Sequence, residues 1–164
     1  MQIQWRTDYD AVLMEASRDG KAVLLDFSAA PTCHDCARLD ADVYADERVI
    51  GLIEEKLIPA RVHLKDNAAD FHTLGERYDA QGTPTVLLLD RNATERHRFE
   101  DFLPADFLAQ LEFAVARIAF NDGRYAEARQ RYAAIAWALA QRRVGHVPTY
   151  WTAASATKAS IRAG

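Results

Sequence analysis

Hydrophobic side chains recur along this chain with two different periods. In five segments they return every three or four residues, the spacing that places them on one face of a helix; these segments are 8–18, 33–43, 46–56, 67–78 and 104–119. Short apolar or alternating runs typical of strands occupy 23–27, 57–64 and 83–90, and a polar segment over 94–100 is typical of an edge strand after a turn. This order predicts an α/β fold, with a mixed sheet and helices on both of its faces.

The chain holds only two cysteines, Cys33 and Cys36, where the strand 23–27 leads into the next helix. Such a pair could cycle as a dithiol, form half of a metal site, or be two inert core thiols. A helix N-terminus lowers the pKa of a thiol, and Cys36 follows one turn later on the same side. The spacing suits a two-step exchange, in which Cys33 attacks a disulfide and Cys36 resolves the mixed disulfide.

Each polar residue near the cysteines can be interpreted in two ways. A protonated His34 would stabilise a Cys33 thiolate and Asp35 would oppose it, or both side chains simply face solvent. Asp26 stands inside an apolar strand, where burial should raise its pKa. It could then take and return the proton of Cys36; otherwise it is partly exposed at the end of the strand.

A metal site is the weaker reading of the cysteine pair. A closed zinc site needs four ligands, commonly in two paired clusters. Cys33, Cys36 and His34 could begin such a site, and His63, His72 or His97 could complete it, but the sequence has no second Cys-x-x-Cys and no His-x₃-His pair. We therefore expect no bound metal, and we expect these histidines to be ordinary surface or packing residues. Glycine-rich phosphate loops and serine-elbow motifs are absent as well.

Composition limits the class of protein further. With 164 residues, 49% of them hydrophobic, the chain can bury a core without disulfide staples. A net charge of −4 argues against general nucleic-acid binding. Because no apolar run approaches a membrane span and no signal-peptide pattern opens the chain, we expect a cytoplasmic location. A lone Cys-x-x-Cys there is more often catalytic or metal-binding than structural.

The segment 121–164 differs from the rest. It carries 7 basic and 2 acidic residues, whereas residues 1–120 carry 13 and 22. Helical periodicity continues to about residue 141, "GHVP" at 145–148 interrupts it, and a second helix could follow. A single helical pair cannot bury its own apolar face. We expect it to dock on the rest of the chain, pair with a second copy, or bind a partner.

Several of these segments together resemble the thioredoxin-like family. The resemblance rests on "KAVLLDFSAAPTCHDC", "ERVIGLIEEKLIPARVHL", "QGTPTVLLLD" and the helix at 104–119, and it covers about residues 8–119. It implies a thioredoxin fold over 1–120. The segment 121–164 looks like a tetratricopeptide-type helical hairpin, which implies a C-terminal helical extension.

The resemblance also implies roles for individual residues. Cys33 would be the nucleophile, Cys36 the resolving thiol and Asp26 the buried acid of the family. Pro84 would be a cis-proline facing the dithiol, with the Thr83 backbone pairing with an extended substrate, and His34 would lie on the same substrate-facing side. The loop from Asp26 to Cys33 is one residue longer than in thioredoxin, and His34 stands first between the cysteines, not second as in disulfide isomerases.

The expected function is thiol–disulfide exchange on protein substrates, as a reductase whose own disulfide is reduced again by an unidentified electron donor. No bound cofactor is implied, because the two thiols carry the electrons. The alternative is an adaptor or co-chaperone that binds partners through the helical tail, with the cysteines secondary.

Overall fold

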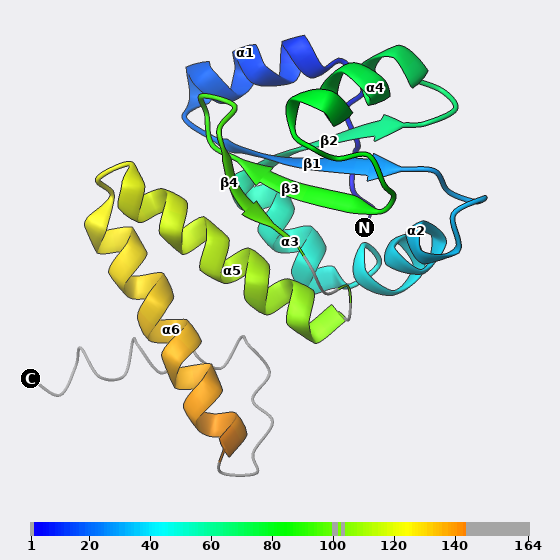
Figure 1. Ribbon diagram of the computed structural model, residues 1–164. Coiled ribbons are helices and arrows are strands. Elements are labelled where there is room, and N and C mark those ends of the chain that lie inside the picture. Colours follow the sequence, from blue (N-terminus) through cyan, green and yellow to red (C-terminus); the bar gives the residue numbers. More distant parts are fainter. Residues whose placement is uncertain (1, 100–101, 103, 144–164) are drawn as a thin grey trace, which may run out of the picture. The chain divides into compact units, whose positions relative to one another are not determined.

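The computed structural model describes residues 2–99, 102 and 104–143 (Figure 1). The chain divides into two compact units, Met1–Val115 and Ala116–Gly164. The division lies inside a helix, shortly before the boundary between residues 120 and 121 expected from the sequence. The two units are therefore described separately.

The elements follow the predicted order. They are α1 (Tyr9–Asp19), β1 (Ala22–Ser28), α2 (His34–Arg38), the π-helical segment η1 (Leu39–Val43), α3 (Glu47–Lys56), β2 (Leu57–His63), α4 (Ala68–Arg77), β3 (Thr85–Leu89), β4 (Glu95–Arg98), α5 (Pro104–Asn121) and α6 (Tyr125–Arg143). One prediction is corrected: the helix expected over 33–43 is a short α-helix that continues as a π-helical turn. None of the helices in the described part of the chain has both the length and the apolarity that a bilayer span requires.

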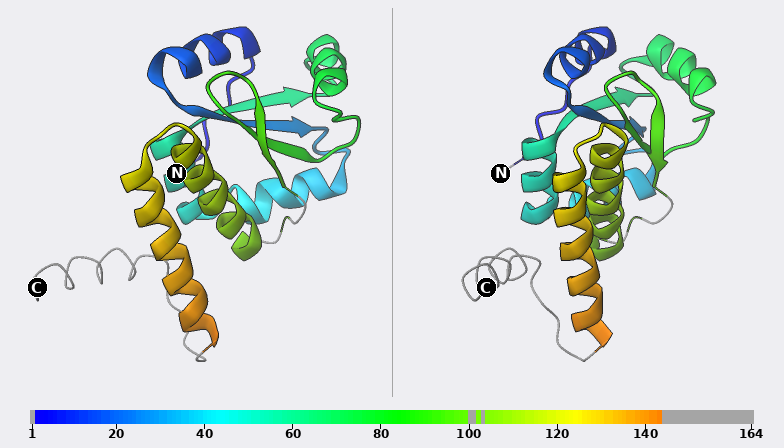
Figure 2. Two further views of the ribbon diagram at one scale, coloured as in Figure 1. Left: turned by 60° about the vertical axis from the view of Figure 1, so that its left-hand side comes forward. Right: turned by 90° about the vertical axis from the view of Figure 1, so that its left-hand side faces the viewer.

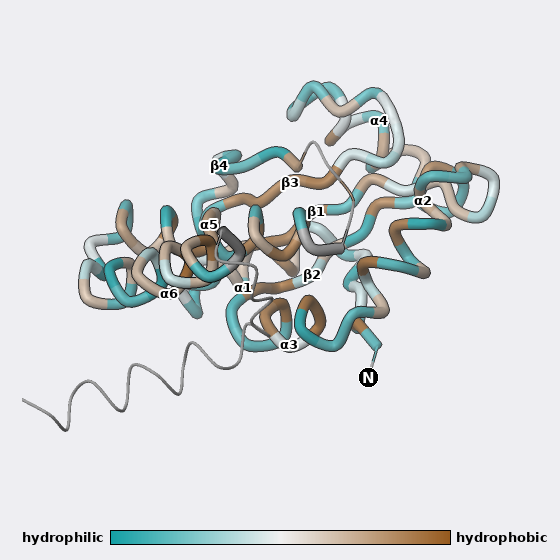
Figure 3. Tube along the Cα trace, turned by 90° about the horizontal axis from the view of Figure 1, so that it is seen from below, coloured by the Kyte–Doolittle hydropathy of each residue, from teal (hydrophilic) through white to brown (hydrophobic). Residues whose placement is uncertain are grey.

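The first unit is built on one mixed sheet with the strand order β2-β1-β3-β4. β1 and β2 are parallel, whereas β3 runs antiparallel to both β1 and β4. Helices α1 and α4 cover one face, and α3 and the start of α5 cover the other (Figure 1 and Figure 2). β4 is one of the two edge strands, and Figure 3 shows that it is hydrophilic whereas the neighbouring β3 is hydrophobic along its length. This confirms the predicted α/β architecture.

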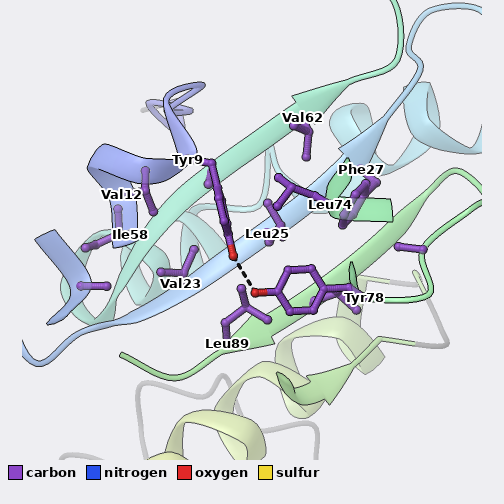
Figure 4. Packing of buried hydrophobic residues seen from close by; sticks show 14 of the residues in the cluster. Tyr9, Val12, Val23, Leu25, Phe27, Ile58, Val62, Leu74, Tyr78 and Leu89 are labelled. Atoms are coloured by element: carbon purple, nitrogen blue, oxygen red, sulfur yellow. Dashed lines mark hydrogen bonds between the residues drawn. The ribbon is translucent and has the colours of Figure 1, made fainter. Parts of the chain in front are cut away.

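Every residue of β1 is buried, so its alternate side chains enter two different layers. Val23, Leu25 and Phe27 join the cluster beneath α1 and α4 (Figure 4). In that cluster the hydroxyls of Tyr9 and Tyr78 meet at 2.6 Å. Asp26 alternates with these residues and therefore projects to the opposite face of the sheet.

The described part of the second unit consists of the end of α5 and the helix α6. A turn with Gly123 at φ +76° joins them, and the Arg124 guanidinium donates to Asp122 and Glu127. The rings of Phe120 and Tyr125 make an edge contact at 5.3 Å. The helix predicted to continue to about residue 141 is therefore present as α6, but the second helix of the expected hairpin lies outside the described residues.

Candidate functional site

The two cysteines lie beyond the carboxyl end of β1, where the chain turns into α2 (Figure 1). They form a disulfide, with their Cα atoms 5.3 Å apart. Cys33 is half-buried and Cys36 is only 2% exposed. An attacking molecule therefore meets Cys33 first, and Cys36 can reach a sulfur only from inside the protein.

Two backbone groups surround the Cys33 sulfur. Cys33 is the N-cap of α2, and the Cys36 amide donates to its Sγ at 3.1 Å. A hydrogen-bond donor at this sulfur favours the thiolate once the disulfide is reduced. The carbonyl oxygen of Thr83 lies 3.6 Å from the same Sγ.

Thr83 belongs to the loop that leads into β3. The Thr83–Pro84 peptide bond is cis, as the resemblance implied, and the Thr85 hydroxyl closes the turn by donating to the Gly82 carbonyl at 2.8 Å. The sheet topology explains why this loop reaches the cysteines. Because β3 is antiparallel to β1, its first residue lies at the edge where β1 ends.

His34 and Asp35 lie between the two cysteines and are exposed to solvent. Their side chains are 84% and 73% exposed, and His34 Nδ1 lies 3.5 Å from Asp35 Oδ1. The structure thus places both in solvent on the first turn of α2, and it brings neither into contact with the Cys33 sulfur. A substrate-contacting role for His34 stays a prediction.

Asp26 is buried, and it carries a partner that the sequence analysis missed. Its Oδ2 accepts a hydrogen bond from Arg61 Nε at 2.7 Å, while Oδ1 has no hydrogen-bond partner among the described residues. Burial raises the pKa of Asp26 to about 6, although the Arg61 charge lowers it. Cys36 is not among the hydrogen-bond partners of this carboxylate in the described part of the chain. Proton exchange between Asp26 and Cys36 therefore also stays a prediction.

Arg61 could have been found from the register of two strands. β1 and β2 pair in parallel with Asp26 beside Arg61. A buried acid in one strand and a basic residue in the next predict an ion pair once the strands are aligned. Without that alignment, Arg61 is only one polar position in an alternating strand.

His63, at the end of β2, holds the loop that leads to Cys33. Its Nε2–H donates to the Ala30 carbonyl oxygen at 2.7 Å, and its Nδ1 lies 3.1 Å from Asp66 Oδ2. The Leu64 amide makes a second hydrogen bond here, by donating to the carbonyl of Ser28, the last residue of β1, at 2.9 Å. The longer loop noted in the sequence is therefore anchored to β2 just before the nucleophile.

Leucine in place of His63 should loosen this loop. One hydrogen bond is worth about 1 kcal/mol, so amide hydrogen exchange at Cys33, whose N–H is bonded to Ala29, should become about fivefold faster. Glutamine is the matched control, because its amide nitrogen can replace Nε2 as the donor to Ala30. Equal exchange rates in the leucine and glutamine variants would show that His63 does not anchor the loop.

The other histidines considered as metal ligands are not gathered at the cysteines. His72 packs edge-on against Phe71, and His97 packs against Phe99. Within the described residues, no group of three or more His, Cys, Asp or Glu side chains is arranged to hold a metal ion.

Comparisons with known proteins agree with this geometry. Residues 9–115 match the model of the thioredoxin-like domain family. Among solved structures, a thioredoxin from Thermus thermophilus is 26% identical, with a TM-score of 0.63 over 76% of this chain and 97% of that chain. The DsbH oxidoreductase is 18% identical, with a TM-score of 0.63 over 70% of this chain and 85% of that chain. A disulphide isomerase from Xylella fastidiosa Temecula1 is 20% identical, with a TM-score of 0.52 over 66% and 95%.

No curated protein sequence matches the chain. The family match spans well over half of the 164 residues, and the structural matches share its sheet and helices. The thioredoxin fold implied by the sequence is confirmed, and the chain belongs to the thioredoxin-like family.

Proposed function

We propose that this protein is a thiol–disulfide oxidoreductase that reduces disulfides in protein substrates through Cys33 and Cys36. The observation that carries the proposal is the pairing of a half-buried Cys33 with a buried Cys36, beside a cis-proline loop whose Thr83 carbonyl lies 3.6 Å from the Cys33 sulfur. A substrate can therefore reach Cys33, whereas Cys36 is shielded from it.

The reaction takes two steps. The Cys33 thiolate attacks a substrate disulfide, so that one substrate sulfur leaves as a thiolate and the other forms a mixed disulfide with Cys33. Cys36 loses its proton and attacks the Cys33 sulfur, which releases the second substrate thiolate and forms the Cys33–Cys36 disulfide. Two electrons thereby pass to the substrate, and an external electron donor must reduce the protein again.

Two groups support these steps. With a pKa of about 6, Asp26 is mostly ionised at neutral pH and can accept the Cys36 proton. The Thr83 backbone pairs with an extended substrate segment in this proposal, which is supported by its carbonyl oxygen lying 3.6 Å from the Cys33 sulfur. Reduction as the direction of exchange and the cytoplasm as the location are parts of this proposal.

Reduction of insulin disulfides by dithiothreitol tests the proposal. The protein should accelerate insulin precipitation, and Cys33→Ser should return the rate to the uncatalysed background, because serine cannot form the mixed disulfide. Without dithiothreitol, reduced Cys36→Ser should form one mixed disulfide per chain with insulin and then stop, because no second thiol of the chain can resolve it. The direction is tested by equilibration with glutathione: a reductase should have a potential nearer to about −270 mV than to about −120 mV.

An adaptor that binds partners through the second unit is the alternative. In the described part of that unit, three large apolar side chains are exposed: Phe120, Tyr125 and Leu139. Such a face favours a partner protein or a second copy of the chain. An adaptor would not accelerate insulin reduction, and its partner binding would be unchanged in Cys33→Ser.

A further inference from the structure

The guanidinium of Arg61 is shared between two carboxylates. Its Nε donates to Asp26 Oδ2 at 2.7 Å. Its two terminal nitrogens donate to Asp40, at 2.5 Å to Oδ1 and at 3.4 Å to Oδ2. The side chain of Asp26 is 1% exposed, that of Arg61 18% and that of Asp40 36%, so the three form a row from the interior towards the surface.

Asp40 comes from the segment that carries the buried cysteine. It lies four residues after Cys36, in the π-helical turn that directly continues α2. Single π-helical turns within helices are frequent at functional sites. The chain segment that holds Cys36 therefore also supplies the outer carboxylate of the row.

Aromatic rings hold the guanidinium in this orientation. The Arg61 Cζ lies 4.3 Å from the ring centroid of Trp5 and 5.5 Å from that of Tyr44. The two rings contact each other edge-on at 4.9 Å. With its nitrogens bound by Asp40 and its face against Trp5, Arg61 has only Nε directed at Asp26.

We propose that Asp40 is a positioning residue for disulfide exchange: by binding the terminal nitrogens of Arg61, it limits the positive charge that reaches Asp26 and so sets how readily Asp26 takes up a proton. The inference rests on the proposed function, because it assumes that Asp26 serves Cys36. It adds to that function a second carboxylate, outside the Cys-x-x-Cys motif, that tunes the pH range of the reaction.

The charges around Asp26 shift its pKa in the directions that the proposed role of Asp40 requires. Burial raises the pKa of Asp26, Arg61 and His63 lower it, and Asp40 raises it. Tyr44 is a further titratable neighbour; burial raises the pKa of its phenol, and the Asp26 charge raises it further. Removing the Asp40 charge should therefore lower the pKa of Asp26 in two ways, since it removes a repulsion and leaves Arg61 with a single anionic partner.

The test measures the Asp26 carboxyl and the exchange reaction separately. The carboxyl ¹³C shift of Asp26 is titrated in the oxidised full chain, where the cysteines do not titrate. In Asp40→Asn the midpoint should move to lower pH by at least about 0.5 unit. The rate at which reduced protein is oxidised by excess insulin, measured over pH, should show its acid limb displaced in the same direction.

Asp42→Asn is the matched control. It removes the same charge from the same π-helical turn, but Asp42 is 55% exposed and its ion pair is with Arg38 at 4.0 Å. In this variant neither the Asp26 midpoint nor the acid limb of the exchange profile should move by more than about 0.2 pH unit, because exposed charges are screened. Asp40→Ser is a second neutral variant and must reproduce the Asn result, whereas Asp40→Glu should stay close to wild type.

Each outcome decides a different claim. An unchanged Asp26 midpoint in Asp40→Asn, or an equal change in Asp42→Asn, overturns the inference. A displaced midpoint with an unchanged exchange profile also overturns it, because Asp26 would then not serve Cys36, but the proposed oxidoreductase function would stand. Absence of exchange in the wild-type protein would instead overturn the proposed function, and with it any role of Asp40 in the reaction.

Discussion

Methionine in place of Arg61 should destabilise the protein by about 3–5 kcal/mol at pH 8, because it removes the guanidinium that pairs with the buried Asp26 carboxylate. Methionine keeps most of the length of the Arg61 side chain but lacks the guanidinium, which lies 4.3 Å from the Trp5 ring centroid, so the loss includes that contact as well as the ion pair. Part of the cost is the free energy of protonating Asp26 in the variant, since its pKa must rise when Arg61 is removed.

The measurement is urea unfolding at pH 8 and at pH 4.5. At the lower pH most of Asp26 is already neutral in the wild type, so the loss on removing Arg61 should shrink. Arg6→Met is the matched control: Arg6 pairs with Glu15 at 3.0 Å, but its side chain is 51% exposed, and such a pair is worth only about 0–1 kcal/mol. Equal losses in the two variants, or a loss at Arg61 that does not depend on pH, would contradict the account.

The fold could be predicted because its signals are local. The apolar run of β1, the helical spacing of α3 and α4 and the polar edge strand β4 each depend on a few neighbouring residues. The pattern of apolar residues in such a segment shows whether one face or both faces of the strand or helix are buried. The predicted elements agree with the observed ones to within a few residues.

The surroundings of Asp26 could not be predicted in this way. The Arg61 contact depends on the parallel register of strands 35 residues apart, and the Asp40 contact on a π-helical turn that helical periodicity does not reveal. His63 was expected to be an ordinary surface or packing residue, and it anchors the Ala30 loop. Cys33, Cys36 and Thr83 were found by motif and meet at the sulfurs, whereas the residues that were missed reach the site through tertiary contacts.

The helical tail shows a different limit. Periodicity predicted the helix α6, and the structure has it, but only Ala128 and Ala138 of its described side chains are buried. A helical pattern shows that a helix forms, yet it does not say what covers the apolar side chains. The choice between docking, pairing and partner binding therefore stays a prediction.

The second large effect concerns stability and pH, and its sign is opposite to that of an ordinary ion-paired carboxylate. The pKa of Asp26 is 3.8 when unfolded and about 6 in the folded protein. Between these values the folded state binds more protons than the unfolded state. Asp26 should therefore lower the free energy of unfolding as pH rises from about 4 to 6, by roughly 3 kcal/mol in all.

Other carboxylates act in the opposite direction and must be separated from it. The pKa values of Asp46 and Asp90 are lowered by hydrogen bonds, although burial opposes the shift for each, so the stability they add is lost at low pH. Asp26→Asn leaves those groups unchanged. The difference in unfolding free energy between wild type and Asp26→Asn isolates the contribution of Asp26.

Measured by urea unfolding at pH 4, 5, 6 and 7, this difference should shift in favour of the variant by about 2.4 kcal/mol between pH 4 and 7, with most of the change complete by pH 6.5. The asparagine oxygen can still accept the Arg61 hydrogen bond, so the pH-independent part should be small by comparison. A difference that stays flat over this range would mean that Asp26 has an ordinary pKa in the folded protein. It would then be too weak a base for Cys36, and the Asp26–Arg61–Asp40 row would be a structural ion pair only.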